Sequence, residues 1–211
     1  MDLLNAIESQ RLEIADTLAT LTPAQWATQS CCDEWTVQEV AAHLTQGWNY
    51  SLAHGMGQML WARGDLGKVN KRCVAPLAAA GPDAIIADLR EHAASDFKPP
   101  GMGFEAPLND LVIHRRDMFL PLGIEYESSG EVVENSLAMA TRGGMAKMVN
   151  SVKHLKGLRC TASDLDWSWG NGPEIIGPAL PLAHALWGRG RSFGELGGPG
   201  VEILRERLAA R

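Results

Sequence analysis

The chain has 211 residues, of which 45% are hydrophobic and 21% are charged, and its net charge is −6. This composition excludes collagen-like, disordered and disulfide-stapled chains and predicts a globular protein. The acidic balance and the lack of a dense Lys/Arg run argue against nucleic acid as a partner, because such binding depends on neutralising phosphates. No apolar stretch has the length of a membrane span, and the first residues lack the apolar segment of a secretory signal. We therefore expect a cytoplasmic protein with no membrane or nucleic-acid partner.

The first two thirds of the chain are predicted to be helical. Apolar residues at helical spacing indicate a helix over 2–21, which Thr22-Pro23 ends. Thr36 and Glu39 form a capping box that starts the next helix, whose far end beyond Gly55 the sequence leaves open. Further helices are predicted over 82–94, 107–119 and 131–152.

After Lys156 the pattern changes from helical to alternating. The predicted strands cover 158–162, 166–169 and 174–176, and two helices follow at 181–187 and 201–208. Gly170-Asn-Gly172 is a turn signal between the last two strands. The predicted fold class is therefore mainly α, with a helix bundle over residues 1–155 and a small α+β domain over 156–211.

Asp110, His114 and His43 form the most informative set of polar residues. Residues four apart lie on one face of a helix, so the Asp110 carboxylate and the His114 imidazole can point at the same ion. His43 occupies a similar flank of the capped helix. Two imidazoles and one carboxylate are a catalytic metal set, in which the fourth position stays open for water or substrate. Such donors suit Zn²⁺ and leave Fe²⁺, Mn²⁺, Co²⁺ and Ni²⁺ open, and the spacing also fits a plain hydrogen-bonded surface pair.

Other polar residues allow both a functional and a structural interpretation. Asp117 continues the row of His114, either as an ion pair with a neighbouring arginine or as the carboxylate that orients a metal-bound histidine. Arg72 and Arg189 are candidates for holding a carboxylate or cofactor by a bidentate fork, and a surface salt bridge is the alternative. Four tryptophans either pack in the core or wall a pocket for a sugar-like ligand: Trp35, Trp48, Trp167 and Trp169.

The four cysteines contain no Cys-x-x-Cys pair and are expected to be reduced, buried thiols. Adjacent Cys31 and Cys32 leave a vicinal disulfide or a soft-metal site as alternatives. Cysteine chemistry is therefore not the expected function.

Three segments together resemble one family. Trp35-Thr-Val-Gln-Glu-Val-Ala-Ala-His43-Leu resembles the Trp-(Ser/Thr)-Val-x-(Asp/Glu)-(Val/Leu)-x-x-His-Leu segment of the mycothiol-dependent maleylpyruvate isomerase family, part of the DinB-like group of metal-binding helix bundles. Asp110-x3-His114-Arg-Arg-Asp117-x3-Pro121-Leu-Gly123 is similar to the second metal segment of that family. The stretch from Asp164 to Arg205 resembles its small C-terminal domain.

The resemblance implies a DinB-like four-helix bundle that holds a divalent metal, usually zinc, by His43, Asp110 and His114. The characterised isomerase has Glu where this chain has the shorter Asp110, so the substrate stays open. The implied activity is that of an isomerase or S-transferase that uses the low-molecular-weight thiol mycothiol and acts on a small electrophilic substrate through a metal-bound thiolate.

Two alternatives differ in class from this prediction. One is a metal-dependent hydrolase with metal-bound water as the nucleophile, and the other is a non-enzymatic metal-binding bundle. The expected partners are a small-molecule substrate and a thiol. The sequence leaves open whether the chain is a monomer or a homodimer.

Overall fold

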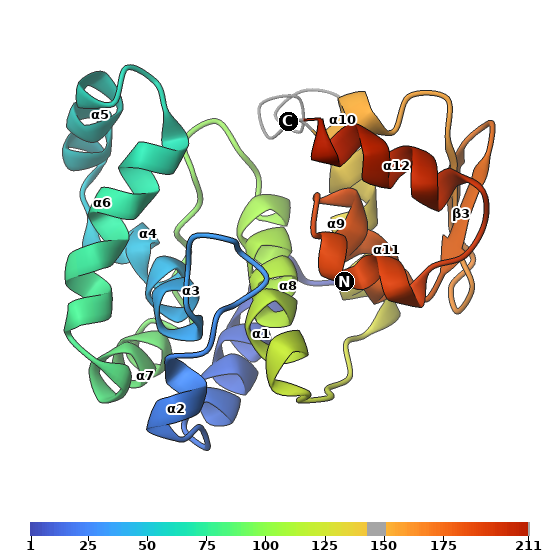
Figure 1. Ribbon diagram of the computed structural model, residues 1–211. Helices are drawn as coiled ribbons and strands as arrows, with labels where there is room; N and C mark the ends of the chain where they lie inside the picture. The colour runs from blue at the N-terminus through green and yellow to red at the C-terminus, as the bar shows by residue number, and fades with distance from the viewer. Residues whose placement is uncertain (143–150, 211) are drawn as a thin grey trace. The chain divides into compact units, whose positions relative to one another are not determined.

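The computed structural model describes residues 1–142 and 151–210. The chain divides into two compact units, Met1–Glu125 and Tyr126–Arg211 (Figure 1). The first is helical and the second adds a small sheet, which confirms the mainly α fold with a small α+β C-terminal part. The division falls after Glu125 and not at the expected 155/156 boundary, because α9 (Gly130–Thr141) packs on α11 (Ala179–Leu186) of the second unit. Every helix in the described ranges is too short or too polar to cross a membrane.

The N-terminal unit is a bundle of helices. It consists of α1 (Leu3–Leu18), α2 (Pro23–Trp26), α3 (Val37–Leu44), α4 (Gln46–Asn49), α5 (Leu52–Trp61), α6 (Leu66–Ala79), α7 (Pro82–Glu91), α8 (Glu105–Phe119) and the 3-10 helix η1 (Leu120–Leu122). Helix α3 packs on α6 and α8, while α1 packs on α7 and α8 (Figure 1). The core between them contains fully buried Ile14, Leu108 and Phe119. Helix α8 therefore contacts helices on two sides and is the central element of the unit.

Local sequence signals fix where the helices around the site begin and end. The capping box before α3 is confirmed, since Thr36 N donates to Glu39 Oε2 over 2.8 Å and Glu39 N donates to Thr36 Oγ1 over 3.3 Å. The capped helix stops at Leu44, and the chain continues through α4 to α5. Pro121 and the left-handed Gly123 (φ 65°) end the helical run of α8 and η1, as the sequence predicts.

Helix α6 is absent from the predicted elements. Gly67 and Pro76 in its sequence argue against a helix, although its buried residues Val69, Cys73 and Ala78 recur at helical spacing. Packing on α3 supplies the stability that the local sequence does not indicate. The helix predicted over 131–152 is described as α9 and α10 (Ser151–His154), and its middle part lies outside the described residues.

Buried Arg11 explains an interruption in the apolar stripe of α1. Its Nη1 donates to the carbonyl oxygens of His92, Ala93 and Ser95 over 3.2, 2.9 and 2.7 Å, and its guanidinium lies over the Trp48 ring. These carbonyls follow the end of α7, where unpaired acceptors attract a cation. Burial lowers the pKa of Arg11 to about 10. The charge in the stripe therefore joins α1 to the end of α7.

The C-terminal unit combines helices with a three-stranded sheet. Besides α9, α10 and α11 it contains β1 (Arg159–Ala162), β2 (Ser168–Gly170), β3 (Glu174–Gly177), the 3-10 helix η3 (Gly190–Glu195) and α12 (Gly200–Ala209). The strand order is β2-β1-β3, with β1 antiparallel to β2 and parallel to β3. The predicted turn at 170–172 therefore joins two strands that both pair with β1. Gly170 is required there, because it has a φ of 76° and a Cβ would collide with the carbonyl oxygen of Leu158.

Candidate metal centre

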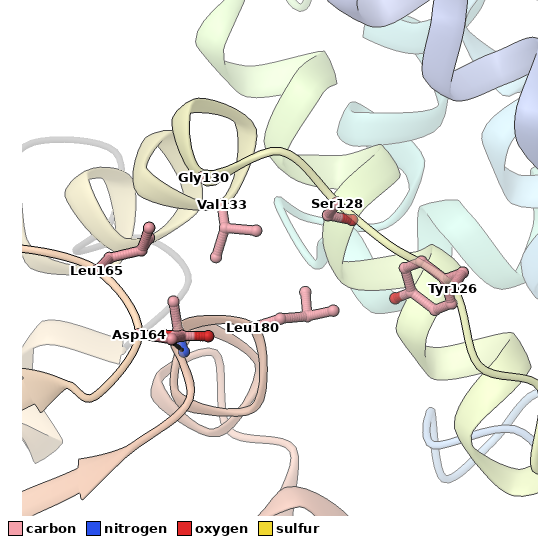
Figure 2. A pocket seen from close by; sticks show the side chains of 8 residues that line it. Tyr126, Ser128, Gly130, Val133, Asp164, Leu165 and Leu180 are labelled. Carbon is pink, nitrogen blue, oxygen red and sulfur yellow. Dashed lines mark hydrogen bonds between the residues drawn. The ribbon is translucent and has the colours of Figure 1, made fainter.

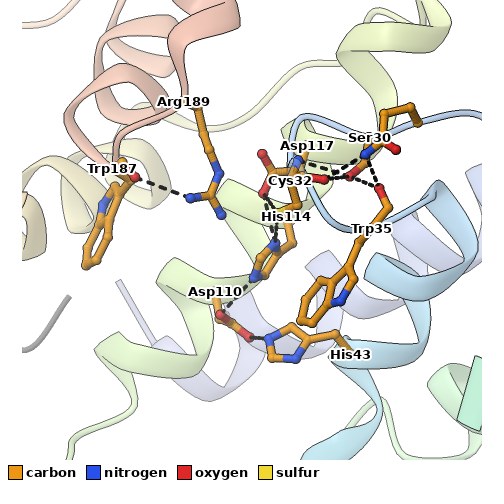
Figure 3. Close-up of polar contacts among 10 residues, drawn as sticks. Ser30, Cys32, Trp35, His43, Asp110, His114, Asp117, Trp187 and Arg189 are labelled. Carbon is orange, nitrogen blue, oxygen red and sulfur yellow. Dashed lines mark hydrogen bonds and ion pairs between the residues drawn. The ribbon is translucent and has the colours of Figure 1, made fainter. Parts of the chain in front are cut away.

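His43, Asp110 and His114 come together where α3 packs on α8 (Figure 3). His43 lies in the last turn of α3, and the other two lie on successive turns of α8. Asp110 uses both oxygens: Oδ2 is 3.4 Å from His43 Nε2, and Oδ1 is 3.4 Å from His114 Nε2. The imidazoles are 14% and 10% exposed, whereas the carboxylate is 47% exposed. The group is thus enclosed on the histidine side and open on the carboxylate side.

A hydrogen bond to Gln46 orients the His43 ring. Its Nδ1 lies 2.8 Å from Gln46 Oε1, and an amide oxygen only accepts, so Nδ1 carries the proton. Gln46 Nε2 in turn donates to Asn70 Oδ1 over 3.4 Å, which sets the orientation of the amide. The lone pair of His43 Nε2 is therefore directed at Asp110.

The fully buried Asp117 orients His114 in the same manner. His114 Nδ1 donates to Asp117 Oδ2 over 2.9 Å, and Cys32 Sγ donates to the same oxygen over 3.1 Å (Figure 3). His114 Nε2 is consequently the ring nitrogen that faces Asp110. Carboxylate and amide partners on the far ring nitrogen are typical of metal-binding histidines.

This arrangement fits a divalent cation. Bonds of about 2.0–2.1 Å from one tetrahedral ion place neighbouring donor atoms about 3.3–3.4 Å apart. Both Nε2 to oxygen distances have this value, which is long for a hydrogen bond between the same atoms. The donor atoms of the three residues all lie within 4.8 Å of one another. Two imidazoles and one carboxylate, with an open side, are also the chemistry expected of a catalytic site.

The electrostatics of the group are those of a coupled ion pair. Burial alone would raise the pKa of Asp110, but the imidazoles of His114 and His43 hold that pKa well below its usual range. Burial would lower the pKa of His114, whereas the Asp110 carboxylate and hydrogen bonds to Asp110, Asp117 and Cys32 raise it well above its usual value. The proton on His114 occupies the place of a cation, so protons and a cation compete for the group.

The loop before α3 covers one side of the group. The Trp35 ring centroid is 5.1 Å from that of His43 and 6.5 Å from that of His114. Ser30 Oγ donates to the carbonyl oxygen of Trp35 over 2.6 Å, and Cys31 N donates to that of Asp117 over 2.9 Å. These bonds attach the loop to α8 and hold the indole against the imidazoles as an apolar wall.

The other predicted pocket residues lie elsewhere. Trp48 donates from Nε1 to Asp88 Oδ1 over 2.9 Å and stacks on His92. Trp167 and Trp169 belong to the C-terminal unit. Arg72 lies over the Trp61 ring, with its Cζ 4.5 Å from the ring centroid, so its described contact is with α5 and not with the group.

Arg189 belongs to the C-terminal unit, where its Nη1 donates to the carbonyl oxygen of Trp187 over 3.3 Å (Figure 3). Its role in binding remains a prediction, as does that of Arg72. The structure adds two residues that the sequence did not single out for the site. Gln46 follows His43 by three positions, a helical spacing that makes it a neighbour, whereas Cys32 reaches Asp117 only through the loop.

All four cysteines are thiols, so no vicinal disulfide joins Cys31 and Cys32. Cys32, His114 and Asp117 form a second group of metal-type donors. This group shares His114 with the first one, and its Nδ1 proton is held by Asp117. It therefore acts as the support of the His43–Asp110–His114 group. Burial raises the pKa of Cys160 in β1 to about 12, which keeps that thiol protonated.

The C-terminal unit contains a cavity of about 340 Å³ (Figure 2). It is lined by Tyr126, Ser128, Gly130, Val133, Asp164, Leu165, Ala179 and Leu180. Asp164 Oδ1 already accepts from the first amide of α11, Ala179 N, over 2.7 Å. The lining contains neither His nor Cys, so it offers no donor set comparable to that of the α3–α8 group.

A helix bundle with a His–Asp–His group defines a candidate metal-binding bundle, and comparisons with known proteins show what the chain is similar to. Residues 7–95 match the mycothiol maleylpyruvate isomerase N-terminal domain. The crystal structures of the mycothiol-dependent maleylpyruvate isomerase and of a histidine-to-alanine variant of it are similar to the chain. Each has a TM-score of 0.63 and 14% identity, and the alignment covers 94% of this chain and 92% of the other. No curated protein sequence matches the chain significantly.

Residues 7–95 thus match the model of the mycothiol maleylpyruvate isomerase N-terminal domain, and the chain has the fold of that isomerase, which confirms the resemblance seen in the sequence. At 14% identity the likeness to the solved structures concerns the fold alone. The matched segment includes His43 but ends before Asp110 and His114. Their assignment as ligands therefore depends on the geometry of α8.

Proposed function

We propose that the protein is a metal-dependent enzyme that uses mycothiol to isomerise or S-conjugate a small electrophilic substrate. The observation that carries the proposal is the placement of two imidazole Nε2 atoms 3.4 Å from the two oxygens of Asp110, with both Nδ1 protons already held. A divalent cation such as Zn²⁺, held by His43, Asp110 and His114, supplies the Lewis acidity that lowers the pKa of a thiol or water. The proposed setting is the cytoplasm.

The residues of the chain prepare this site in three ways. Gln46 and Asp117 hold the Nδ1 protons, so that the rings present their Nε2 atoms without further reorganisation. Trp35 excludes water from the imidazole side. The half-exposed Asp110 marks the open side, where a small molecule can approach.

The state of Asp117 favours a thiol over water as the nucleophile. Metal-dependent hydrolases of the His-Glu-x-x-His type use a carboxylate base beside the metal-bound water. Asp117 is fully buried and already accepts from His114 and Cys32, so it is not available for that role. A thiol whose proton is acidified by the cation needs no such base.

Metal analysis tests the ligand assignment. Elemental analysis of the purified protein is expected to find about one divalent cation per chain, and His43→Ala, Asp110→Ala and His114→Ala should each lose it. His92→Ala is the matched control, because His92 stacks on Trp48 away from the group and should leave the metal content unchanged. Full metal content in His114→Ala would show that the assignment is wrong.

Turnover then tests the reaction class. The metal-loaded protein is incubated with maleylpyruvate and related unsaturated acids, with and without mycothiol. We expect isomerisation or conjugate formation only when the thiol is present. Hydrolytic turnover without thiol would favour the hydrolase, and bound metal with no turnover would favour a non-enzymatic bundle.

A further inference from the structure

Most of the exposed large apolar side chains of the N-terminal unit lie on α5 and at the start of α6. Five of the nine exposed large hydrophobic residues in the described chain are Leu52, Met56, Leu60, Trp61 and Leu66. Leu52, Met56 and Leu60 are 62%, 60% and 80% exposed. None of the ten residues of α5, all of which the structure describes, is buried. Such a concentration on two consecutive helices is unusual for a surface that faces only water.

The exposed residues form a stripe along one face of the helix. Leu52, Met56 and Leu60 are four residues apart and so lie in one row, which we call the α5 stripe. The flank of the stripe holds the helix in place, since Met59, three residues after Met56, packs against Ala62, Val69 and Cys73. No Asp, Glu, Lys or Arg occurs between Ser51 and Ala62. Helix α5 therefore reverses the usual order, in which charged residues face solvent.

We propose that the α5 stripe is a self-association surface, on which α5 of a second copy packs antiparallel across a twofold axis near Met56. A twofold contact needs a patch that is complementary to itself. The stripe has this form, because Leu52 of one copy faces Leu60 of the other on either side of Met56. Gly57 is adjacent and its missing Cβ would meet nothing within 4 Å, so the second helix can approach closely.

Charge selects a second copy over other occupants. The chain carries a net charge of −6, so two copies repel each other overall, and the uncharged α5 stripe adds no charge repulsion of its own where it meets its copy. Helices that lie on membranes carry Lys and Arg on their polar face, and α5 has neither. The same lack of charge offers nothing to a strongly charged partner.

The size of the surface predicts a weak dimer. Each large apolar side chain contributes about 100 Å², so the three residues of the α5 stripe give about 300 Å² per copy. With Trp61 and Leu66, which follow the stripe in the chain, the area is at most about 500 Å² per copy and about 1,000 Å² in total. This is at the lower limit for a specific interface. We therefore expect a dissociation constant of about 1–100 µM and a monomer–dimer equilibrium that depends on concentration.

Sedimentation equilibrium of the full chain between about 1 and 200 µM tests the proposal. The mass should rise from that of the 22.8 kDa monomer toward twice that value. Met56→Glu places two like charges near the axis and should raise the dissociation constant at least tenfold. Leu12→Glu is the matched control, since Leu12 is also exposed but lies on α1. A wild type that stays monomeric throughout, or equal effects of both variants, would overturn the proposal.

A symmetric cross-link tests the axis itself. Met56→Cys should form a disulfide-linked dimer on mild oxidation, because the two introduced thiols face each other, whereas Leu12→Cys should not. Unchanged circular dichroism and metal content in each variant would show that the fold and the α3–α8 group are intact. Flotation of the protein with anionic vesicles, together with a monomeric state in solution, would assign the α5 stripe to a lipid surface and contradict self-association.

Discussion

Helices α8 and α5 depart in opposite directions from the rule that polar residues lie outside and apolar residues inside. Twelve of the fifteen residues of α8 are buried, among them His114, Arg115, Arg116 and Asp117. Helix α5 has no Asp, Glu, Lys or Arg, and none of its residues is buried. Both departures are informative, because a buried polar group needs a partner and an exposed apolar patch indicates one.

The partners of α8 lie within the chain. Asp117 accepts from His114 and Cys32, while Arg115 reaches Glu13 and Gln10 on α1. These bonds compensate for the desolvation of the charges and fix the ring that faces Asp110. Helix α5 has no such internal compensation, so its explanation is a contact outside the chain. The candidate metal site therefore lies on α8, and the proposed association surface lies on α5.

Replacing Asp117 should have the largest effect. Asp117→Ala leaves the His114 Nδ1 proton and the Cys32 thiol without their buried acceptor. We expect a loss of about 2–4 kcal/mol in the free energy of unfolding and a metal affinity that is about 10–100-fold weaker. Urea unfolding with and without EDTA measures the first effect, and calorimetric zinc titration measures the second.

Asp117→Asn is the matched control for this change. Its amide oxygen still accepts from His114 Nδ1, so both losses should be smaller than in Asp117→Ala. Metal affinity that is unchanged in the alanine variant would show that Asp117 does not support the candidate site.

Replacing Arg115 should reduce stability and leave the metal in place. Its side chain is 5% exposed and its Nη1 lies 2.6 Å from Glu13 Oε2, whereas Glu13 is 44% exposed and has access to water. Arg115→Met is therefore expected to cost about 1–3 kcal/mol, and Glu13→Gln less than about 1 kcal/mol. Unfolding curves and elemental analysis check both expectations. Loss of metal in Arg115→Met would extend the site to the α1 side of α8.

Changing Gln46 should weaken the metal site with little effect on stability. Gln46→Leu removes the acceptor of the His43 Nδ1 proton, which allows the ring to change tautomer or rotate. We expect about tenfold weaker zinc binding and a change in stability within about 0.5 kcal/mol. Gln46→Glu retains an acceptor and should bind zinc at least as tightly as the wild type. Equal affinities in all three proteins would remove Gln46 from the site.

Features that depend on neighbouring residues could be predicted from the sequence. The capping box of α3, the end of α8 at Pro121–Gly123 and the common face of Asp110 and His114 all arise within one or two helical turns. The meeting of His43 with α8 is a tertiary contact, which the sequence indicated through the position of His43 on the flank of its helix and through the family resemblance. The comparisons confirm the fold of that family and leave the ligands to experiment.

The remaining features require contacts that leave no local pattern. In the sequence, Arg11 only interrupts an apolar stripe. The structure shows that it donates to carbonyl oxygens that follow the end of α7. Cys32 reaches Asp117 only because the loop before α3 is attached to α8. Helix α6 contains a glycine and a proline, and its packing on α3 stabilises it. The division after Glu125 is likewise set by the packing of α9 on α11, since α9 is as helical as the elements before it.

The smallest effect is expected on α5, and it tests the comparison directly. Leu60→Ala and Leu108→Ala delete the same atoms, but Leu60 is 80% exposed and Leu108 on α8 is fully buried. Leu108→Ala should cost about 2–5 kcal/mol, because it removes a core contact and leaves a cavity. Leu60→Ala, measured at a concentration where the chain is monomeric, should stay within about 0.5 kcal/mol of the wild type. A loss of more than about 1 kcal/mol in the free energy of unfolding of Leu60→Ala would mean that α5 is covered by the chain itself. The contrast with α8 would then disappear, and a second copy would not be needed to explain α5.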